Sequence, residues 1–225
     1  MSAEPKWREM TPQGTVLEQY RKAFLNDLFI NTDNFGKLKW LGYPIWQNVL
    51  DLWTIQETLA EIKPAILIEC GTFQGGSAIF YAHLFDLMNH GRVVSIDNEK
   101  RHSLTHPRVE FLIGSSISQP IVEQINARVA AADGPVMVIL DSDHTAQHVF
   151  REMLAYAPMV TPGSFMMVQD GVCDTLDIAQ MSVPGPLAAI VEFMKHHPEF
   201  SIDRERCERF LITHHPAGWL RKRLG

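Results

Sequence analysis

Two groups of polar residues follow apolar segments in the second half of the sequence, and their types suit metal-assisted chemistry. The first group follows Val136–Leu140 and the second follows Phe165–Val168: Asp141, Asp143 and His144, then Gln169 and Asp170. Carboxylate and amide oxygens are suitable ligands for a hard cation such as Mg²⁺. A cation held there would bind neighbouring hydroxyls of a substrate and make one more acidic. His144 could then take the proton, because its reference pKa of about 6.5 lies near neutral pH.

Simpler roles are possible for some of these side chains. Asp143 or Asp141 could do no more than cap the helix that follows. His148 lies four residues after His144, a spacing found in zinc sites, but the segment HTAQH lacks the glutamate of the HExxH motif. We interpret His148 as a helix-surface or internally bonded residue. Two more histidine pairs precede prolines at element ends, which predicts surface positions: His196–His197 and His214–His215.

An earlier glycine-rich segment, Glu69–Ser77 (ECGTFQGGS), follows an apolar run and precedes a helical pattern. Phe73 occupies the place where a dinucleotide-binding GxGxxG motif needs its second glycine, and the Lys-Ser/Thr pair of a P-loop is missing. These departures favour a ligand with a cationic end and a ribose but no phosphate, such as S-adenosylmethionine. Glu69 could accept from the ammonium group or anchor the loop. Tight packing of a strand-to-helix turn is the alternative reason for the glycines.

Two later strand ends supply the rest of a nucleoside site. Asp97 ends the next apolar strand, where an acid in a doubly wound sheet commonly accepts from ribose hydroxyls. Gly114, Ser115 and Ser116 end the strand after that, at the place where an adenine edge would lie. Together with the acids further along the chain, these residues favour a cofactor site over simple packing.

The elements that must position these residues alternate from residue 64 onward. Five apolar runs are expected to be strands: Ala65–Ile68, Arg92–Ile96, Val109–Ile113, Val136–Leu140 and Ser164–Val168. Because the runs are continuously apolar, they predict a parallel sheet covered by helices on both faces. The connecting helices are expected at residues 76–89, 118–131, 145–156 and 186–196. This is an α/β doubly wound pattern, in which the polar strand ends meet above one crevice.

The remaining segments extend this core. Apolar residues at spacings of three and four predict an amphipathic helix over residues 45–62. Two short runs, Phe200–Ile202 and Phe210–Thr213, flank the charged turn Asp203–Arg206 and predict a closing hairpin. Residues 1–40 are expected to form a helical extension, and residues 41–225 the single domain that carries the site.

The composition excludes several classes of protein. The 225-residue chain is 46% hydrophobic and 20% charged, as in ordinary soluble globular proteins. Its formal charge is −6 and its basic residues are scattered, so no nucleic-acid partner is expected. The first residues lack a signal-peptide pattern, and no run approaches the roughly 18 apolar residues of a membrane span. Three cysteines without a CxxC pair predict reduced thiols, and we expect a cytoplasmic protein.

Five segments carry a resemblance to a known family over about residues 38–223: Trp40–Asn48 (WLGYPIWQN), Glu69–Ser77, Leu140–His144 (LDSDH), Tyr156–Gly163 (YAPMVTPG) and Phe210–His214 (FLITH). They resemble the cephalosporin hydroxylase / rhamnosyl O-methyltransferase family of class I S-adenosylmethionine-dependent methyltransferases. The resemblance implies a Rossmann-like fold with a mostly parallel seven-stranded sheet, dependence on Mg²⁺ and methylation of a hydroxyl on a sugar or glycoside.

The resemblance also implies roles for individual residues. The expected cofactor-binding residues are Glu69, Gly71, Thr72, Phe73, Gly75, Ser77, Asp97, Ser115, Ser116 and Asp141. The metal would be held by Asp141, Gln169 and Asp170, with His144 and Asp141 as the catalytic residues. The acceptor would contact Trp40, Gln47 and His144. Relatives usually have Glu-Asp where this chain has Gln169–Asp170, so a neutral amide replaces an anionic ligand and weaker metal binding is expected.

Two other functions stay open from the sequence. A hydroxylase, which the family's older name suggests, would use iron held by two histidines and a carboxylate, and only Asp141, His144 and His148 approximate that set. A non-catalytic module that binds S-adenosylmethionine is the second possibility, favoured by Gln169. For a methyltransferase, the expected acceptor is a rhamnosyl or mannosyl unit of a polysaccharide, glycolipid or antibiotic. The aromatic-rich residues 35–53 could form a lid or the interface of a homodimer.

Overall fold

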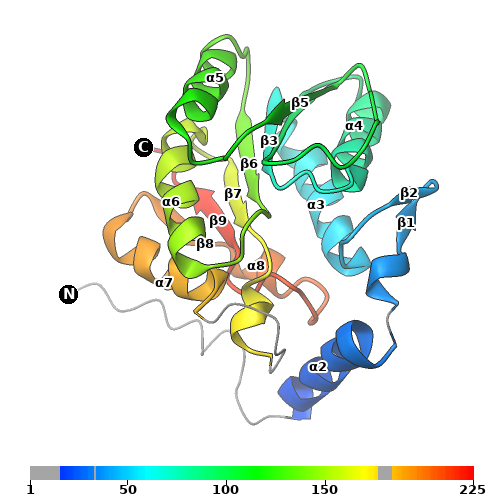
Figure 1. The fold of residues 1–225 in the computed structure, drawn as a ribbon. Helices are drawn as coiled ribbons and strands as arrows, with labels where there is room; N and C mark the ends of the chain where they lie inside the picture. Colours follow the sequence, from blue (N-terminus) through cyan, green and yellow to red (C-terminus); the bar gives the residue numbers. More distant parts are fainter. Residues whose placement is uncertain (1–15, 33, 177–183) are drawn as a thin grey trace.

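The computed structural model describes residues 16–32, 34–176 and 184–225, and its centre is a seven-stranded sheet (Figure 1). The strand order is β5-β4-β3-β6-β7-β9-β8. The strands are β3 Ile66–Cys70, β4 Arg92–Asp97, β5 Val109–Ile113, β6 Val136–Leu140, β7 Phe165–Val168, β8 Phe200–Ile202 and β9 Trp219–Lys222. Strands β3 to β7 run parallel, while β9 is antiparallel to β7 and β8. The predicted mostly parallel seven-stranded sheet is confirmed.

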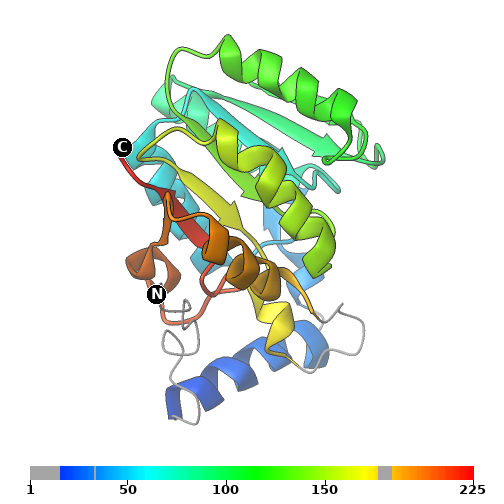
Figure 2. The same ribbon diagram turned by 90° about the vertical axis from the view of Figure 1, so that its left-hand side faces the viewer.

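Helices cover both faces of the sheet. Helices α3 Val49–Ile62 and α4 Gly76–Met88 lie on one face (Figures 1 and 2). The other face is covered by α5 Gln119–Ala130, α6 Ala146–Tyr156 and α7 Pro186–His196. Shorter helical turns are η3 Ala157–Met159, η4 Gly171–Asp174 and α8 Arg204–Cys207. The central strands β3 and β6 are buried along their whole length, because helices exclude water from both sides. The predicted α/β class and connecting helices are confirmed.

The register of the central strands places the polar residues at one edge of the sheet. Cys70, the last residue of β3, pairs with Ile96 of β4 and with Leu140 of β6. The backbone N–H of Asp141 donates to the Cys70 carbonyl at 2.7 Å, and that of Gln169 donates to the Leu140 carbonyl at 2.9 Å. The residues that follow each strand therefore begin at the same level, as the parallel arrangement predicted.

The N-terminal part contains α2 Val16–Asn26, the turns η1 Asp27–Asn31 and η2 Phe35–Lys37, and a small hairpin of β1 Lys39–Trp40 and β2 Tyr43–Pro44. Helix α2 lies below the main body in both views (Figures 1 and 2). The hairpin packs closely on α4, since a Cβ on Gly76 would lie 1.9 Å from the Pro44 carbonyl oxygen. Residues 1–15 of the predicted extension lie outside the described residues. The hairpin crosses the expected boundary at residue 40, and the division into two parts stays a prediction.

Two expected elements differ in the structure. Helix α3 begins at Val49 and not at residue 45, because Asn48 adopts an extended backbone and its side chain accepts from the Leu50 N–H at 3.1 Å. The predicted hairpin partner of β8 is wrong: residues 210–213 form a loop, and Leu211 has a left-handed φ of 64°. The partner is β9, in which only Trp219 and Leu220 are buried, an apolar pair too short to indicate a strand.

The described residues also bear on two expectations from composition. Cys70, Cys173 and Cys207 are buried free thiols. Within residues 16–32, 34–176 and 184–225, none of the helices combines the length and the apolar character needed to cross a membrane.

Candidate active site

A cavity of about 760 Å³ opens at the carboxyl ends of the parallel strands. Most of the expected site residues line it: Gln47, Gly71, Thr72, Phe73, Ser77, Asp97, Ser115, Ser116, Asp141, His144 and Asp170. Four other expected residues do not line the cavity: Trp40, Glu69, Gly75 and Gln169. The structure thus brings together strand-end residues that are far apart in the sequence, in the crevice where α/β sheets bind ligands.

The glycine loop after β3 packs directly against the end of β6. Gly71 has a φ of 104°, and a Cβ there would lie 1.8 Å from the Asp141 carbonyl oxygen. Phe73 also has a left-handed φ, 46°, which allows its N–H to donate to Asp97 Oδ2 at 2.7 Å. The other oxygen, Oδ1, accepts from the Glu99 N–H at 3.1 Å. The Asp97 carboxylate is therefore fixed at the cavity wall, with lone pairs left for ligand hydroxyls.

Glu69 lies behind this loop and is 1% exposed. Its Oε2 accepts from Ser95 Oγ at 2.5 Å, and that hydroxyl also lies 2.6 Å from Thr72 Oγ1. The sequence suggested two roles for Glu69, and these contacts support the one in which it anchors the loop. Burial raises the pKa of Glu69 from an ordinary 4.5 to about 8, because the charged form is separated from water.

Replacing Glu69 with glutamine is expected to stabilise the protein more at high pH than at low pH. Between pH 4.5 and about 8, native Glu69 keeps a proton that the unfolded chain has lost, so native stability falls as pH rises through this window. Glutamine has no such proton to lose. The melting temperature of the variant minus that of the wild type should rise by about 4 °C or more between pH 5 and pH 8.5. Glu99→Gln, at an exposed carboxylate, is the control. A difference that stays constant with pH would contradict the buried proton.

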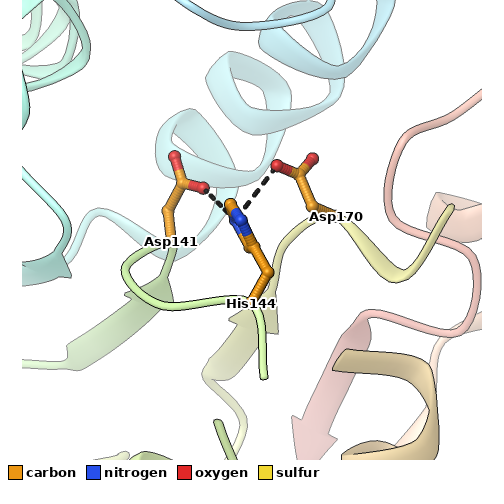
Figure 3. Close-up of side chains that lie close together, drawn as sticks. All are labelled: Asp141, His144 and Asp170. Carbon is orange, nitrogen blue, oxygen red and sulfur yellow. Dashed lines mark hydrogen bonds and ion pairs between the residues drawn. The ribbon is translucent and has the colours of Figure 1, made fainter. Parts of the chain in front are cut away.

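Asp141, His144 and Asp170 form a compact cluster on the cavity wall. Figure 3 shows the three side chains pointing toward one another from the ends of β6 and β7 and the loop before α6. His144 Nε2 lies 3.5 Å from Asp141 Oδ1 and 3.2 Å from Asp170 Oδ2. One ligand atom from each residue lies within 4.8 Å of the other two. Two carboxylates at this separation suit a divalent cation such as Mg²⁺, and the imidazole beside them is a proton acceptor.

The charges in this cluster are strongly coupled. Burial alone would lower the pKa of His144, but its hydrogen bonds to Asp141 and Asp170 and their charges raise it to about 11. Burial raises the pKa of Asp141 to about 6, whereas the His144 imidazolium holds the pKa of Asp170 below its ordinary value in spite of burial. The two carboxylates therefore favour the protonated form of His144, which lies between them.

Gln47 connects the third expected ligand to this cluster. Its Nε2 donates to Asp141 Oδ2 at 2.9 Å and to Gln169 Oε1 at 2.8 Å. Gln169 is 2% exposed. Among the described residues, the buried Oε1 of Gln47 has no hydrogen-bond partner, so one further oxygen is available at this place. The oxygen donors fit Mg²⁺. Coordination by Gln169 itself stays a prediction, because its Oε1 is engaged by Gln47.

Trp40, expected at the acceptor site, does not line the cavity. Its Nε1 donates to His83 Nδ1 at 2.9 Å and its ring packs edge-on against Phe80 of α4. Trp46 lines the cavity instead and is 46% exposed. Two phenylalanines of the N-terminal segment, Phe29 and Phe35, form the wall beside it. The sequence predicted a lid or an interface for the aromatic-rich residues 35–53. Its periodicity did not indicate which aromatic ring faces the cavity.

His148 also lines the cavity but belongs to a different cluster. Its Nε2 lies 3.3 Å from Glu152 Oε1, and the same oxygen accepts from Ser142 Oγ at 2.7 Å and Ser116 Oγ at 2.5 Å. His148 is therefore internally bonded, one of the two alternatives that the sequence left open. Because it is tied to Glu152, the two-histidine, one-carboxylate set of an iron hydroxylase is not assembled among the described residues.

The histidine pair His214–His215 is not on the surface as predicted. Both residues are 1% exposed and lie beside Asp170. Pro216 indicated the end of an element correctly, but the loop folds inward because Asp51 of α3 accepts from the His214 N–H at 2.9 Å. Burial lowers the pKa of His214 to about 4. Spacing along the chain gave no signal for these contacts.

The strand order, the glycine loop after β3 and the acid at the end of β4 place the protein in the class of doubly wound α/β proteins with a ligand crevice at the strand ends. Comparisons with known proteins are consistent with this class. A family model described as Rhamnosyl O-methyltransferase/CmcI matches residues 33–223. The chain belongs to this family.

Individual relatives support the same assignment. The Rhamnosyl O-methyltransferase of Mycobacterium bovis (strain BCG / Pasteur 1173P2) is 31% identical over 215 residues, covering 93% of this chain and 86% of the relative. The Mycobacterium leprae protein of the same name is 29% identical over 216 residues, covering 93% and 91%. A structure of CmcI with Mg and SAM superposes with a TM-score of 0.67 at 17% identity, covering 85% of this chain and 78% of the other. This last similarity shows the fold.

Proposed function

We propose that the protein transfers a methyl group from S-adenosylmethionine to a hydroxyl of a sugar or glycoside, with Mg²⁺ as the resident ion. The observation that carries this function is the Asp141–His144–Asp170 cluster, which faces the same cavity as the glycine loop and Asp97. The relatives named Rhamnosyl O-methyltransferase support the sugar acceptor. A MycE methyltransferase solved with Mg, SAH and Mycinamycin VI has a similar fold, with a TM-score of 0.51 at 17% identity.

Different residues of the chain bind different parts of the cofactor. The Asp97 carboxylate, held by the Phe73 and Glu99 N–H groups, accepts from ribose hydroxyls. The loop from Gly71 to Ser77 receives the methionine part, and Ser115 and Ser116 meet the adenine. Holding both reactants in one cavity is expected to supply most of the rate enhancement, since a two-molecule reaction becomes effectively intramolecular.

His144 takes the proton of the acceptor. Asp141 and Asp170 would hold Mg²⁺, which would supply Lewis acidity at the acceptor hydroxyl and compensate the charge of the two carboxylates beside His144. The oxygen then forms a bond to the methyl carbon as the carbon–sulfur bond breaks in line. The hydroxyl proton passes to His144 Nε2, and S-adenosylhomocysteine leaves. Asp141 and Asp170 then stabilise the imidazolium that forms.

The acceptor side of the cavity is aromatic. Trp46 is held by edge contacts with Phe35 and Phe73, whose ring centroids lie 6.0 and 5.7 Å from its own. Gly36 makes room for it, since a Cβ there would lie 2.8 Å from Trp46 Cη2. Gln47, the residue after Trp46, donates to Asp141. A sugar bound near the acid cluster would therefore have its apolar C–H face against this wall.

Replacing Trp46 with alanine is expected to raise the acceptor KM by about 3–10-fold, because an aromatic contact contributes roughly 0.5–1.5 kcal/mol. The Kd of S-adenosylhomocysteine, measured by calorimetry, should stay unchanged. Trp53→Ala is the matched control, since Trp53 is 58% exposed on α3 and does not line the cavity. Equal KM values for the two variants would place the acceptor elsewhere.

A screen of glycosides for release of S-adenosylhomocysteine tests the proposed function. Rhamnosides and mannosides are expected to give Mg²⁺-dependent release that a chelator abolishes. Release that continues in the presence of the chelator would contradict a role for Mg²⁺ in the reaction. Oxygen uptake on addition of iron would favour a hydroxylase. Binding of S-adenosylmethionine without any turnover would favour the non-catalytic module. A homodimer and a cytoplasmic location stay predictions.

A further inference from the structure

Asp170 has an unusual backbone for a residue in an acid cluster. It follows β7 with a φ of 55°, a left-handed conformation that glycine adopts freely and other residues rarely do. A glycine there could not supply the carboxylate that faces His144. The position therefore combines a required side chain with an unfavourable backbone, and such backbones persist where surrounding contacts hold them.

His215 provides such a contact. Its Nδ1 accepts from the Asp170 N–H at 2.9 Å. On the other side of the residue, the Val172 N–H donates to the His214 carbonyl at 3.0 Å. The loop of residues 213–216 therefore runs along the Asp170 turn and binds its backbone twice. Because Nδ1 accepts, the neutral imidazole carries its proton on Nε2.

Asp51, in the first turn of α3, lies beside the opposite edge of the ring, although His215 Nε2 makes no hydrogen bond among the described residues. Its Oδ2 lies 3.6 Å from His215 Nε2. The carboxylate is 3% exposed and also accepts from Thr213 Oγ1 at 2.6 Å, from the His214 N–H at 2.9 Å and from Asn48 Nδ2 at 3.0 Å. One buried acid thus fixes the loop that carries the His215 ring.

We propose that Asp51 and His215 are positioning residues for the Asp170 carboxylate. Through the N–H of Asp170, the pair holds the left-handed turn that directs this carboxylate toward Asp141 and His144. The inference rests on the proposed Mg²⁺ site. It gives a function to a histidine that neither binds the ion nor lines the cavity, and groups of this kind behind metal ligands commonly change metal affinity by about 10–100-fold.

Two substitutions of His215 separate positioning from simple packing. Asparagine places its Oδ1 where Nδ1 lies and can still accept from the Asp170 N–H. Glutamine places its Oε1 near the Nε2 position, one bond further out, and leaves that N–H without its acceptor. We expect His215→Gln to raise the Kd of Mg²⁺ about tenfold or more and His215→Asn to stay within about threefold of the wild type. The Kd of S-adenosylhomocysteine should change little in either variant.

The measurement is calorimetric titration with Mg²⁺ alone, together with a thermal melt of each variant. Arg209→Ala is the matched control, because Arg209 lies shortly before this loop and ties the chain to α3 through Glu57 at the surface, with two contacts of 2.9 Å. It should lower the melting temperature without changing Mg²⁺ affinity. If His215→Gln does not fold, Asp51→Asn is the second test and is also expected to weaken Mg²⁺ binding.

Equal Mg²⁺ affinities in the Asn and Gln variants would overturn the inference. So would affinities that fall in step with melting temperature across all variants, Arg209→Ala included. Absence of Mg²⁺ binding by the wild type would remove both the metal site and this inference. Failure to methylate any sugar, with Mg²⁺ still bound, would remove only the proposed acceptor.

Discussion

Replacing His144 with alanine is expected to lower kcat by about 10²–10⁴-fold while S-adenosylmethionine still binds. His144 is the group in the acid cluster that can take a proton from an acceptor, and its Nε2 lies 3.2 Å from Asp170 and 3.5 Å from Asp141. The cofactor contacts assigned to Asp97 and the glycine loop do not involve it. Turnover is measured with a glycoside from the screen, and cofactor affinity by calorimetry.

The same substitution also changes the charge of the cluster. Without the imidazolium, the carboxylates of Asp141 and Asp170 face each other uncompensated, so the pKa of Asp170 should rise toward its ordinary value. The raised pKa of His144 contributes stability that is complete below its ordinary 6.5 and is lost as pH rises toward 11. The variant should therefore melt below the wild type at pH 7. His196→Ala, an exposed histidine at the end of α7, is the control. A near-normal kcat for His144→Ala would show that another group is the base.

The strands that are buried along their whole length could be predicted from the sequence. Prediction failed where only one or two residues of an element are buried. Continuously apolar runs indicated β3, β6 and β7 because both faces of those strands are covered. Strand β9 carries only Trp219 and Leu220 as buried residues, so no run distinguished it from a loop. Ile45 fits the helical period of α3 yet lies outside the helix, because its burial comes from packing near Gly76 and the cap at Asn48 sets the start.

The candidate site was predictable to the extent that it depends on strand ends. Asp97, Asp141 and Asp170 each follow a parallel strand, and parallel strands bring their carboxyl ends to one edge. Contacts between distant loops gave no such signal. The loop that carries His215 to Asp170 is bound to Asp51, and His214 of that loop is 163 positions from Asp51 in the sequence. Likewise, the choice of Trp46 over Trp40 at the cavity is made by the β1–β2 hairpin, which turns Trp40 onto α4.

Replacing Gly71 with alanine is expected to abolish cofactor binding and to destabilise the protein. The added Cβ would lie 1.8 Å from the Asp141 carbonyl oxygen and 2.4 Å from its carbon, and both are backbone atoms that cannot rotate away. The ends of β3 and β6 would have to separate, which moves Asp141 as well as the loop. Overpacking costs about 1–3 kcal/mol and a left-handed alanine about 1–2 kcal/mol. The melting temperature should fall by about 4–15 °C, and calorimetry should show no S-adenosylhomocysteine binding at concentrations that saturate the wild type.

Gly42→Ala isolates the backbone part of this effect. Gly42 has a similar φ of 92°, but nothing lies within 4 Å of the Cβ that alanine would add. The Gly42→Ala variant should be destabilised only by the cost of the left-handed conformation, and it should keep the wild-type cofactor affinity. The difference between the two variants then measures the contact between the loop and β6. If Gly71→Ala bound S-adenosylhomocysteine as tightly as Gly42→Ala, the close approach of the loop to Asp141 would not be what shapes the cofactor site.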